Sequence, residues 1–250
     1  NRIFLLTLAR IYHKKLNFDM HLNNNLKYGI IGVGHLGNYH IQQISKLENV
    51  SLVGCFDINP SQARLAKKNY KIKIFQKIED LFDMADVVSI ATPASLHFSV
   101  TSKALQEGCH VFIEKPIAHN VKEARRLISL ANKKNCLIQV GHIERFNPAY
   151  RFLCESNPVP RFIETHRLAP FNIRGTDVNV VLDLMIHDID LILNLVNSEI
   201  KTIVASGVNI LSQSTDLANA RIEFKNGCVA NLTASRVSAK KLRKMRVFEH

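Results

Sequence analysis

The sequence predicts an α/β protein in which a parallel sheet is followed by a second α/β part with an open, mainly antiparallel sheet. From Leu26 onward, short apolar runs alternate with longer amphipathic segments, which is the pattern of βαβ units. After about Gly141 the β-like stretches become longer, which indicates a change of domain. With 250 residues, 46% of them hydrophobic, the chain is long enough to bury a sizeable core in each part.

Short apolar runs predict five buried strands in the first part, at residues 28–33, 51–56, 87–91, 110–113 and 137–140. The amphipathic segments between them predict four helices, at residues 40–47, 60–69, 96–107 and 121–134. Asn120 and Glu123 have the spacing of a capping box, which marks the start of the last of these helices.

The second part is predicted to contain three β-like stretches, at residues 162–168, 202–210 and 218–234. One strongly apolar helix is predicted among them, at residues 180–196. The Asn226-Gly227 step predicts a hairpin, because both residues tolerate the positive φ of a tight turn. We expect three regions along the chain: a poorly structured extension over 1–26, an α/β domain over 27–141 and a second, incomplete domain over 142–250. The natural start is expected at Met20, and the abrupt stop at His250 suggests a fragment.

The formal net charge of +12 lies mainly at the two ends of the chain. Residues 1–28 hold five basic residues (Lys or Arg) and one acidic residue, and residues 236–250 hold six basic residues and one acidic residue. The stretch between these two ends therefore carries a net charge of only +3. The basic cluster 240–246 could contact phosphate groups, but a solvated basic face is the more ordinary interpretation. We therefore expect no nucleic-acid partner.

The five cysteines are scattered and form no C-x-x-C pair, so neither a disulfide framework nor a metal site is predicted, and a reducing, cytoplasmic location fits best. The apolar run 3–9 is far shorter than the roughly 20 residues that a membrane span requires. It resembles a short signal peptide, but Arg10 interrupts it and no small-residue cleavage site follows. No membrane association is expected.

Gly32, Gly34 and Gly37 form a G-x-G-x-x-G motif that follows a predicted strand and opens a helix. The first glycine permits a tight turn, the second lets the backbone approach a pyrophosphate, and the third allows close helix packing. Free N–H groups at the helix N-terminus, near His35 and Leu36, would bind the anion. The motif predicts a Rossmann dinucleotide-binding domain, and a glycine-rich turn without ligand is the alternative.

Asp57 ends the second predicted strand and lies twenty positions beyond Gly37, where a carboxylate can accept hydrogen bonds from the adenosine ribose. A 2′-phosphate would be repelled there, so NAD is favoured over NADP, although nearby Arg64 leaves NADP open. The alternative is that Asp57 starts a turn and caps the next helix.

Two further strand ends are expected at the same edge of the sheet, where ligands of open parallel sheets bind. Thr92 and Pro93 follow the third predicted strand, and they either line the cleft or only stop the strand. Glu114 and Lys115 follow the fourth strand, and Pro116 restricts Lys115 to an extended conformation. A lysine desolvated beside a nicotinamide can polarise a carbinol oxygen, whereas a solvated surface lysine is the ordinary alternative.

Asp183, His187, Asp190 and Asn194 fall within roughly 60° of one another on the helix 180–196, at about 100° per residue. A polar stripe on such an apolar helix costs free energy unless each group is paired or faces a cavity. Asp183 lies one turn before His187, and a carboxylate so placed can orient an imidazole for general acid–base chemistry. A satisfied buried network is the alternative.

Four polar residues outside this helix are candidates for substrate binding. Arg145 and Asn147 follow the last strand of the first domain, and Arg167 and Arg174 flank the loop before the polar helix. A guanidinium group pairs bidentately with phosphate or carboxylate, so the arginines could hold either group of a substrate. Ordinary surface pairing is the alternative for each arginine taken singly.

The combination of G-x-G-x-x-G, an aspartate after the second strand, Ala-Thr-Pro, Glu-Lys-Pro and Asp-x-x-x-His resembles the glucose–fructose oxidoreductase and inositol dehydrogenase family, also called Gfo/Idh/MocA. The resemblance covers about residues 27–250. It implies a Rossmann domain before an α/β domain with an open sheet, catalysis by Lys115 and His187, and contact of Asp183 with substrate. It also implies a homo-oligomer formed through the second sheet. Members of the family are longer, which again suggests a missing closing part.

Within the family, residues 141–148 and 174–188 resemble enzymes that oxidise position 3 of UDP-N-acetylglucosamine for lipid A synthesis. The resemblance implies that NAD accepts a hydride from a sugar-ring carbon while His187 removes the hydroxyl proton. His97 and Glu114 are expected along the cofactor cleft. The alternatives are another sugar or inositol dehydrogenase, or a non-catalytic NAD-binding regulator.

Overall fold

The computed structural model describes residues 25–172 and 177–249. The chain divides into two compact units, of which unit 1 ends at Gly141 and unit 2 begins at His142. The expected start at Met20 and the expected role of Arg174 lie outside the described residues, as does nearly all of the predicted N-terminal extension.

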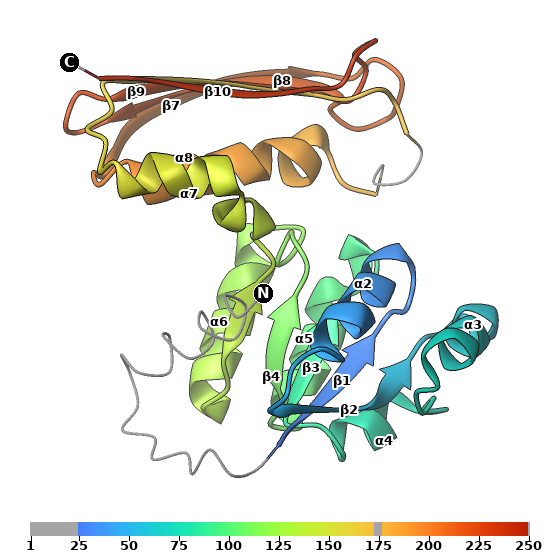
Figure 1. Ribbon diagram of the computed structural model, residues 1–250. Coiled ribbons are helices and arrows are strands. Elements are labelled where there is room, and N and C mark those ends of the chain that lie inside the picture. Colours follow the sequence, from blue (N-terminus) through green and yellow to red (C-terminus); the bar gives the residue numbers. More distant parts are fainter. Residues whose placement is uncertain (1–24, 173–176, 250) are drawn as a thin grey trace. The chain divides into compact units, whose positions relative to one another are not determined.

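Unit 1 is built on a five-stranded parallel sheet, sheet A, with the strand order β2-β1-β3-β4-β5 (Figure 1). The strands are β1 (Leu26–Ile31), β2 (Val50–Phe56), β3 (Val87–Ile90), β4 (His110–Ile113) and β5 (Ile138–Val140). The helices are α2 (His35–Ile44), α3 (Pro60–Tyr70), α4 (Ile78–Phe82), α5 (Ala94–Gln106) and α6 (Val121–Lys134). The doubly wound parallel sheet that the alternating pattern predicts is confirmed.

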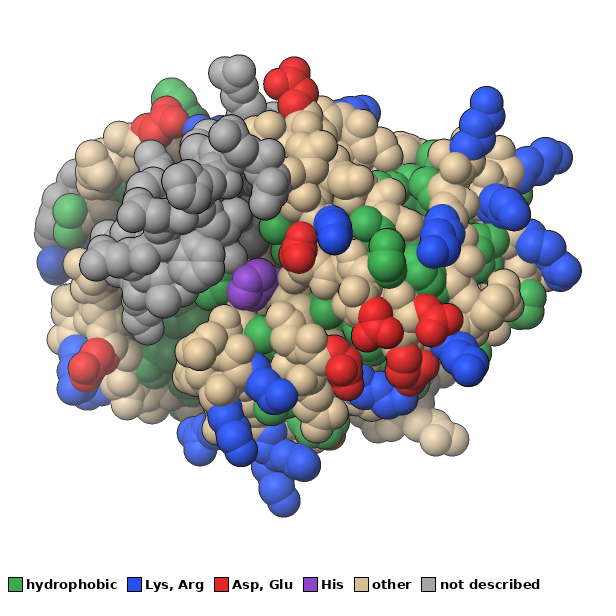
Figure 2. Space-filling model, turned by 90° about the horizontal axis from the view of Figure 1, so that it is seen from below, with side chains coloured by type: hydrophobic (Ala, Val, Ile, Leu, Met, Phe, Trp, Pro, Cys, Tyr) green, Lys and Arg blue, Asp and Glu red, His purple; other side chains and the backbone are tan. Residues whose placement is uncertain are grey.

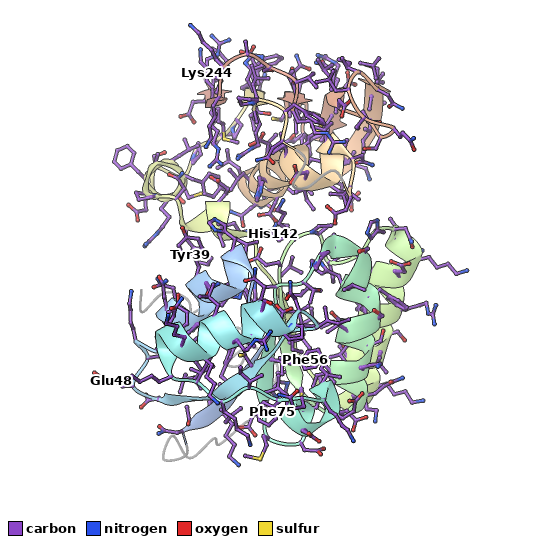
Figure 3. The ribbon with its side chains drawn as sticks, turned by 90° about the vertical axis from the view of Figure 1, so that its right-hand side faces the viewer. Tyr39, Glu48, Phe56, Phe75, His142 and Lys244 are labelled. Atoms are coloured by element: carbon purple, nitrogen blue, oxygen red, sulfur yellow. The ribbon has the colours of Figure 1, made fainter. Side chains whose placement is uncertain are left out.

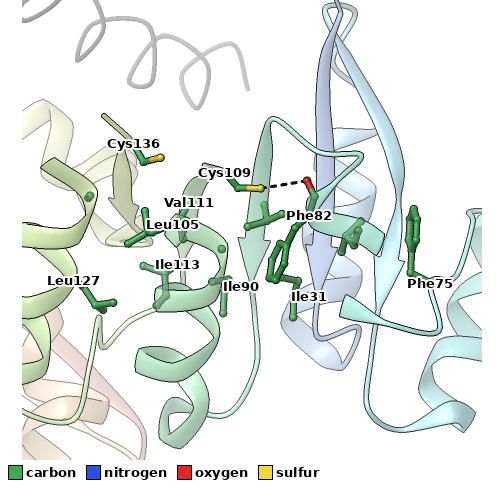
Figure 4. Packing of buried hydrophobic residues seen from close by; sticks show 14 residues of the cluster. Ile31, Phe75, Phe82, Ile90, Leu105, Cys109, Val111, Ile113, Leu127 and Cys136 are labelled. Atoms are coloured by element: carbon green, nitrogen blue, oxygen red, sulfur yellow. Dashed lines mark hydrogen bonds between the residues drawn. The ribbon is translucent and has the colours of Figure 1, made fainter. Parts of the chain in front are cut away.

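Successive residues of β1 point to opposite faces of sheet A, and helices cover both faces. Ile30 belongs to the apolar cluster beneath α2 and α3, whereas Ile31 and Leu127 belong to the cluster beneath α4, α5 and α6. Figure 4 shows the second cluster, in which the Cys109 thiol donates a hydrogen bond to the Phe82 carbonyl oxygen. Because both faces are buried, these strands are nearly continuous apolar runs in the sequence.

Unit 2 is built on a five-stranded mixed sheet, sheet B, with the strand order β10-β6-β9-β8-β7. The strands are β6 (Phe162–Leu168), β7 (Ile200–Val208), β8 (Leu217–Phe224), β9 (Val229–Ser235) and β10 (Leu242–Phe248). Only the β6–β9 pair of this sheet is parallel, so the mainly antiparallel sheet is confirmed. The helices are a 3-10 helix (Ile143–Phe146), α7 (Pro148–Glu155), a π-helical turn (Val181–Met185) and α8 (Ile186–Leu195).

Helix α8 lies against one face of sheet B with α7 beside it, and no helix of the described residues covers the opposite face (Figure 1). Ile163 of β6, Leu232 of β9 and Ile192 of α8 are fully buried between the sheet and the helix. The edge strand β7 is exposed along its whole length. Unit 2 therefore has one packed face, one open face and an exposed edge.

The local signals for two chain turns are confirmed. At the start of α6, the Asn120 side chain accepts a hydrogen bond from the backbone N–H of Glu123 at 2.9 Å. Between β8 and β9, Gly227 has a φ of +85°, and the Asn226 side chain accepts a hydrogen bond from the backbone N–H of Cys228. Only the glycine uses the positive φ that both residues tolerate, and the asparagine closes the turn with its side chain.

Helices α4 and α7 are absent from the prediction, and three further elements differ from it for identifiable reasons. Helix α2 begins at His35 rather than at residue 40, because Gly37 in its first turn has a low helix propensity and favours a loop in the sequence pattern. The predicted helix 180–196 is divided into a π-helical turn and α8. Strand β10 is absent from the predicted elements because its Lys and Arg residues indicate a solvated basic cluster rather than a strand.

The basic cluster lies on an exposed strand whose charges are partly paired. Arg246 of β10 forms an ion pair with Glu164 of β6, and Lys244 lies on the side of sheet B away from α8 (Figure 3). Figure 2 shows a different face of the molecule, on which acidic and basic side chains both occur. Among the described residues, no helix has the length and apolar character needed to cross a membrane.

Candidate active site

The loop between β1 and α2 holds the three glycines of the predicted cofactor motif. Gly32 has a φ of +84°, and a Cβ there would lie 2.7 Å from the Ala91 carbonyl oxygen. A Cβ on Gly37 would lie 1.9 Å from the Gly32 carbonyl oxygen, whereas a Cβ on Gly34 would meet nothing within 4 Å. The fold therefore requires the first and third glycines, and the second borders open space.

Gly34 is also the N-cap residue of α2, and no side chain caps this helix. His35 and Leu36, the next two residues, are exposed. An uncapped helix N-terminus presents backbone N–H groups and the positive end of the helix dipole, which together bind anions. The open space above Gly34 is thus chemically suited to a pyrophosphate.

Asp57 follows β2 and holds the glycine loop in place. Its Oδ2 accepts a hydrogen bond from the Val33 N–H at 2.8 Å, and its Oδ1 accepts one from the Asn59 N–H at 2.8 Å. The contact with Asn59 agrees with the prediction that Asp57 starts the turn, but the N-cap of α3 is Asn59, whose side chain accepts from the Ser61 N–H, so the predicted role of Asp57 as the cap is wrong. A carboxylate oxygen has more than one acceptor site, so Asp57 retains capacity for ribose hydroxyls.

His97 connects two of the loops at the same edge of sheet A. It is 1% exposed, and its ring nitrogens lie 2.6 Å from the Pro116 carbonyl oxygen and 3.0 Å from the Thr92 carbonyl oxygen. Pro93 is the N-cap residue of α5. The burial and contacts of His97 favour a role in holding these loops rather than direct contact with a cofactor.

Glu114 and Lys115 come directly after β4. Glu114 is 8% exposed, and its Oε1 lies 2.9 Å from His40 Nε2. Lys115 is half-buried, and the Lys115–Pro116 peptide bond is cis. The carboxyl ends of parallel strands therefore bring the glycine loop, Asp57 and Glu114 with Lys115 to one edge of sheet A.

In unit 2, Asp183 lies in the π-helical turn and His187 in the first turn of α8, and both are half-buried. The Asp183 N–H donates to the Asn179 carbonyl oxygen at 3.0 Å. π-Helical turns occur frequently at functional sites, because they re-aim side chains at the cost of regular hydrogen bonding. The two residues that the sequence favours for acid–base chemistry therefore lie at an irregular point of an otherwise regular helix.

The other members of the predicted polar stripe are engaged in structural contacts. Asp190 forms a bidentate ion pair with Arg145, with nitrogen–oxygen distances of 2.6 and 2.7 Å. Hydrogen bonding to Asp190 raises the pKa of Arg145 above its ordinary value. The Asn194 side chain donates to the Tyr150 hydroxyl at 2.8 Å. Half of the stripe thus matches the alternative of a satisfied network.

Arg167 is a buried member of an ion-pair cluster. It is 6% exposed, and its guanidinium group donates to Asp188 at 2.6 Å and lies 3.5 Å from Glu144. Burial opposes the charge of Arg167, but hydrogen bonds to Asp188 and Glu144 and the charges of these two carboxylates together outweigh it, so the pKa of Arg167 stays above its ordinary value. Glu144 also accepts from Arg243 of β10 at 3.0 Å. These contacts give Arg167 a structural role that the sequence did not indicate.

Asn147, the remaining described candidate for substrate binding, is the N-cap residue of α7. Its side chain accepts a hydrogen bond from the Ala149 N–H at 3.0 Å. The capping explains why an asparagine precedes Pro148 at this point of the chain, since proline suits the first position of a helix.

A second buried ion pair, Asp216 with Arg236, holds the segment that leads into the π-helical turn. Asp216 Oδ1 accepts from Arg236 Nε at 2.8 Å, and Arg236 Nη1 donates to the Val178 carbonyl oxygen at 2.8 Å. Burial raises the pKa of Asp216, but hydrogen bonds from Ser212, the backbone and Arg236 outweigh it and hold the pKa far below its usual value. Sequence reasoning missed this pair because its two members lie on separate strand ends.

The comparisons with known proteins match both units. Residues 26–142 match the family described as "Oxidoreductase family, NAD-binding Rossmann fold", and residues 162–248 match the "GFO/IDH/MocA C-terminal domain". The chain belongs to the Gfo/Idh/MocA oxidoreductase family. The resemblance seen in the motifs is therefore confirmed, together with NAD as the cofactor class of this family.

Several Gfo/Idh/MocA relatives match most of the chain. UDP-N-acetylglucosamine 3-dehydrogenase of Acidithiobacillus ferrooxidans is 40% identical over 225 residues, which are 90% of this chain and 71% of that protein. A solved structure of that enzyme has a TM-score of 0.84 and covers 90% of this chain and 74% of its own. The scyllo-inositol 2-dehydrogenase (NAD(+)) of Bacillus subtilis is 25% identical over 239 residues, 87% of this chain and 69% of that protein.

The residues of unit 1 fit the dinucleotide of the Gfo/Idh/MocA family. The Thr92 hydroxyl oxygen is buried at the edge of sheet A and has no hydrogen-bond partner within the described ranges 25–172 and 177–249. Gly34 leaves open space at the uncapped end of α2, and Asp57 offers acceptor capacity after β2. A buried polar atom without a partner, an open helix end and a carboxylate are the groups that a dinucleotide would satisfy.

We expect Gly34→Val to weaken NADH binding by about tenfold or more, close to 1.4 kcal/mol, with little change in stability. The new side chain would occupy the open space beside the helix end. Gly37→Ala should instead lower stability by about 1–3 kcal/mol, because its Cβ would collide with the Gly32 carbonyl group. NADH titration by fluorescence and thermal unfolding of both variants would separate the two effects, and unchanged NADH affinity in Gly34→Val would contradict the assignment.

Arg167→Met should lower the free energy of unfolding by about 3–5 kcal/mol, because it leaves Asp188 buried without its main partner. The double variant Arg167→Met with Asp188→Leu should regain most of this loss. Arg221→Met is the matched control, since its ion pair with Glu223 is exposed on both sides and contributes about 0–1 kcal/mol. Urea unfolding measures all three variants, and a double variant as unstable as the single one would count against a structural role.

Proposed function

We propose that this protein is an NAD-dependent dehydrogenase that oxidises the 3-hydroxyl group of UDP-N-acetylglucosamine to a ketone. The observation that carries the proposal is the 40% identity over 225 residues to an enzyme named for this reaction. The match includes the segments that hold Lys115 and His187, and the arrangement of each unit supports it. Within the proposal, residues 27–141 bind NAD and residues 142–250 bind the substrate.

NAD+ supplies a hydride acceptor, C4 of its nicotinamide ring. The protein residues then have to manage the proton of the hydroxyl group. His187 accepts this proton as the carbon loses its hydride, since a neutral imidazole is the natural base near neutral pH. Asp183, one turn earlier, orients His187 or holds a sugar hydroxyl. Lys115 stabilises the developing negative charge on the substrate oxygen.

The proposed substrate contacts are Asp183, His187, Arg145 and Asn147. Arg145 retains 44% exposure of its side chain while it binds Asp190, so its guanidinium group has donors left for a phosphate or sugar oxygen. Arg167 acts through its partners rather than on the substrate, because it is buried. A ketone at position 3 of this sugar nucleotide would serve lipid A precursor synthesis.

The test is to follow NADH absorbance while the purified protein is offered UDP-N-acetylglucosamine, UDP-glucose, free N-acetylglucosamine, glucose 6-phosphate, and scyllo- and myo-inositol. We expect reduction of NAD+ with UDP-N-acetylglucosamine and at least about 100-fold lower kcat/KM with the others, because a site built for polar groups strongly disfavours analogues that lack them. A response to an inositol alone would indicate the alternative that the 25% identical relative suggests.

Two variants accompany this assay. His187→Gln and Lys115→Met should each reduce kcat by about 10²–10⁴-fold and leave the Kd of NADH within a few-fold of the original. Normal turnover in both variants would exclude these roles. NADH binding without turnover of any compound in the series would favour a non-catalytic NAD-binding regulator.

We further propose that the chain self-associates through the uncovered face and edge of sheet B. Exposed apolar residues lie together along the edge strand β7, including Ile203 at 58%, Val204 at 64% and Val208 at 51% exposure. Exposed apolar residues that lie together on a sheet mark interaction surfaces, and closed symmetric dimers are the commonest outcome.

Val204→Lys with Val208→Lys should convert the oligomer into single chains, because two charges would have to be buried at the interface. Val121→Lys, at an equally exposed apolar position of unit 1, is the matched control. Light scattering after size-exclusion chromatography gives the mass of each variant. A mass of one chain for the unmodified protein would refute the interface.

A further inference from the structure

A buried array of polar side chains crosses unit 1 beneath the edge of sheet A. Ser89 of β3 is fully buried, and its Oγ lies 2.5 Å from Nδ1 of His40 on α2. The opposite ring nitrogen, Nε2, lies 2.9 Å from Oε1 of Glu114. The side chains of His40 and Glu114 are only 15% and 10% exposed. The imidazole ring of His40 thus joins Ser89 and Glu114, which lie 49 and 74 positions after it in the chain.

With Glu114 ionised and the imidazole ring neutral, one tautomer of His40 fits both contacts. An ionised carboxylate only accepts hydrogen bonds, so Nε2 of His40 carries the hydrogen and donates to Glu114. In the neutral ring Nδ1 then has no hydrogen and accepts the hydroxyl hydrogen of Ser89. The ring is fixed further by an edge contact with Phe112, with the ring centroids 5.3 Å apart. In this tautomer both ring nitrogens of His40 have a hydrogen-bond partner.

Glu114 is also confined on its other side. A Cβ on Gly141 would lie 3.2 Å from Oε2 of Glu114 and 3.3 Å from Cζ of Phe112, so the glycine allows the carboxylate to sit against the backbone. Burying a carboxylate is costly, and a packed apolar residue would often stabilise the fold as well or better. The array is therefore poorly explained by stability alone.

The position of the array suggests a different purpose. His40 belongs to α2, whose N-terminus follows the glycine loop, and Glu114 directly precedes Lys115. We propose that His40 is a positioning residue: by clamping the Glu114 carboxylate, it fixes the backbone from which Lys115 extends and ties it to the helix that faces the cofactor. The inference rests on the catalytic role of Lys115 under the proposed function.

Two substitutions of His40 separate the two ends of the ring. A glutamine amide reaches the position of Nε2, so His40→Gln keeps a donor for Glu114 and loses the link to Ser89. An asparagine amide reaches only the position of Nδ1, so His40→Asn keeps the link to Ser89 and loses the clamp. Ser89→Ala removes the link to His40, together with the interaction of Ser89 with the buried Tyr28 hydroxyl group, and leaves the clamp on Glu114 in place. Gln43→Ala, at an exposed position of the same helix, is the control for general effects on α2.

We expect His40→Asn to reduce kcat with UDP-N-acetylglucosamine on the order of tenfold to a hundredfold, as misplacement of a catalytic group does, with the Kd of NADH within a few-fold. His40→Gln should retain kcat within about threefold, at a similar melting temperature to His40→Asn. Equal losses of kcat in both variants, or normal kcat in His40→Asn, would overturn the proposal.

Two measurements need no turnover and so remain decisive if the proposed substrate is wrong. Nitrogen-15 NMR of the histidines should show His40 as the Nε2–H tautomer, and an Nδ1–H tautomer would overturn the array. Acylation of Lys115 by an amine-reactive ester, followed by mass spectrometry with and without NADH, should be faster in His40→Asn than in His40→Gln. Equal rates of acylation in the two variants would refute the positioning role.

Discussion

The close packing of α2 on the end of β1 is the constraint on which the cofactor-facing edge of unit 1 depends. A Cβ on Gly37 would lie 1.9 Å from the Gly32 carbonyl oxygen, so the helix can approach the end of the strand only because residue 37 lacks a side chain. On the helix held in this position, His40 lies within reach of Ser89 and Glu114. The glycine motif, which is usually discussed for ligand binding, therefore also determines how α2 packs on β1.

The parts of the fold with strong local patterns could be predicted from the sequence. The bounds of the buried strand β4 coincide with those of an apolar run, and the start of helix α6 coincides with the position that the Asn120 cap predicts. Strand β10 could not be predicted, because its place in sheet B depends on pairing with β6, more than seventy residues earlier in the chain. Pairing between distant segments leaves no periodic signal when the strand is exposed and basic.

The sequence allowed us to predict which residues belong to the candidate site, but not which partners each of them contacts. Charge and spacing singled out Arg167 and Asp190, but burial and bidentate pairing show that Arg167 satisfies Asp188 and that Asp190 satisfies Arg145. An ion pair between distant residues is invisible to a reading of one segment at a time. His40 offered one usable signal: a histidine one turn after the last motif glycine, on the face of α2 that packs against the sheet.

The strand order of sheet B has a consequence for how the chain acquires its structure during synthesis. Unit 1 is formed by one uninterrupted stretch of chain, so it can fold while later residues are still being translated. Among the described strands of unit 2 the earliest, β6, lies between β9 and β10, which both come much later in the chain. Both neighbours of β6 are therefore translated well after it. Until then the nascent chain carries a strand with two open edges, which is a condition under which molecular chaperones are needed.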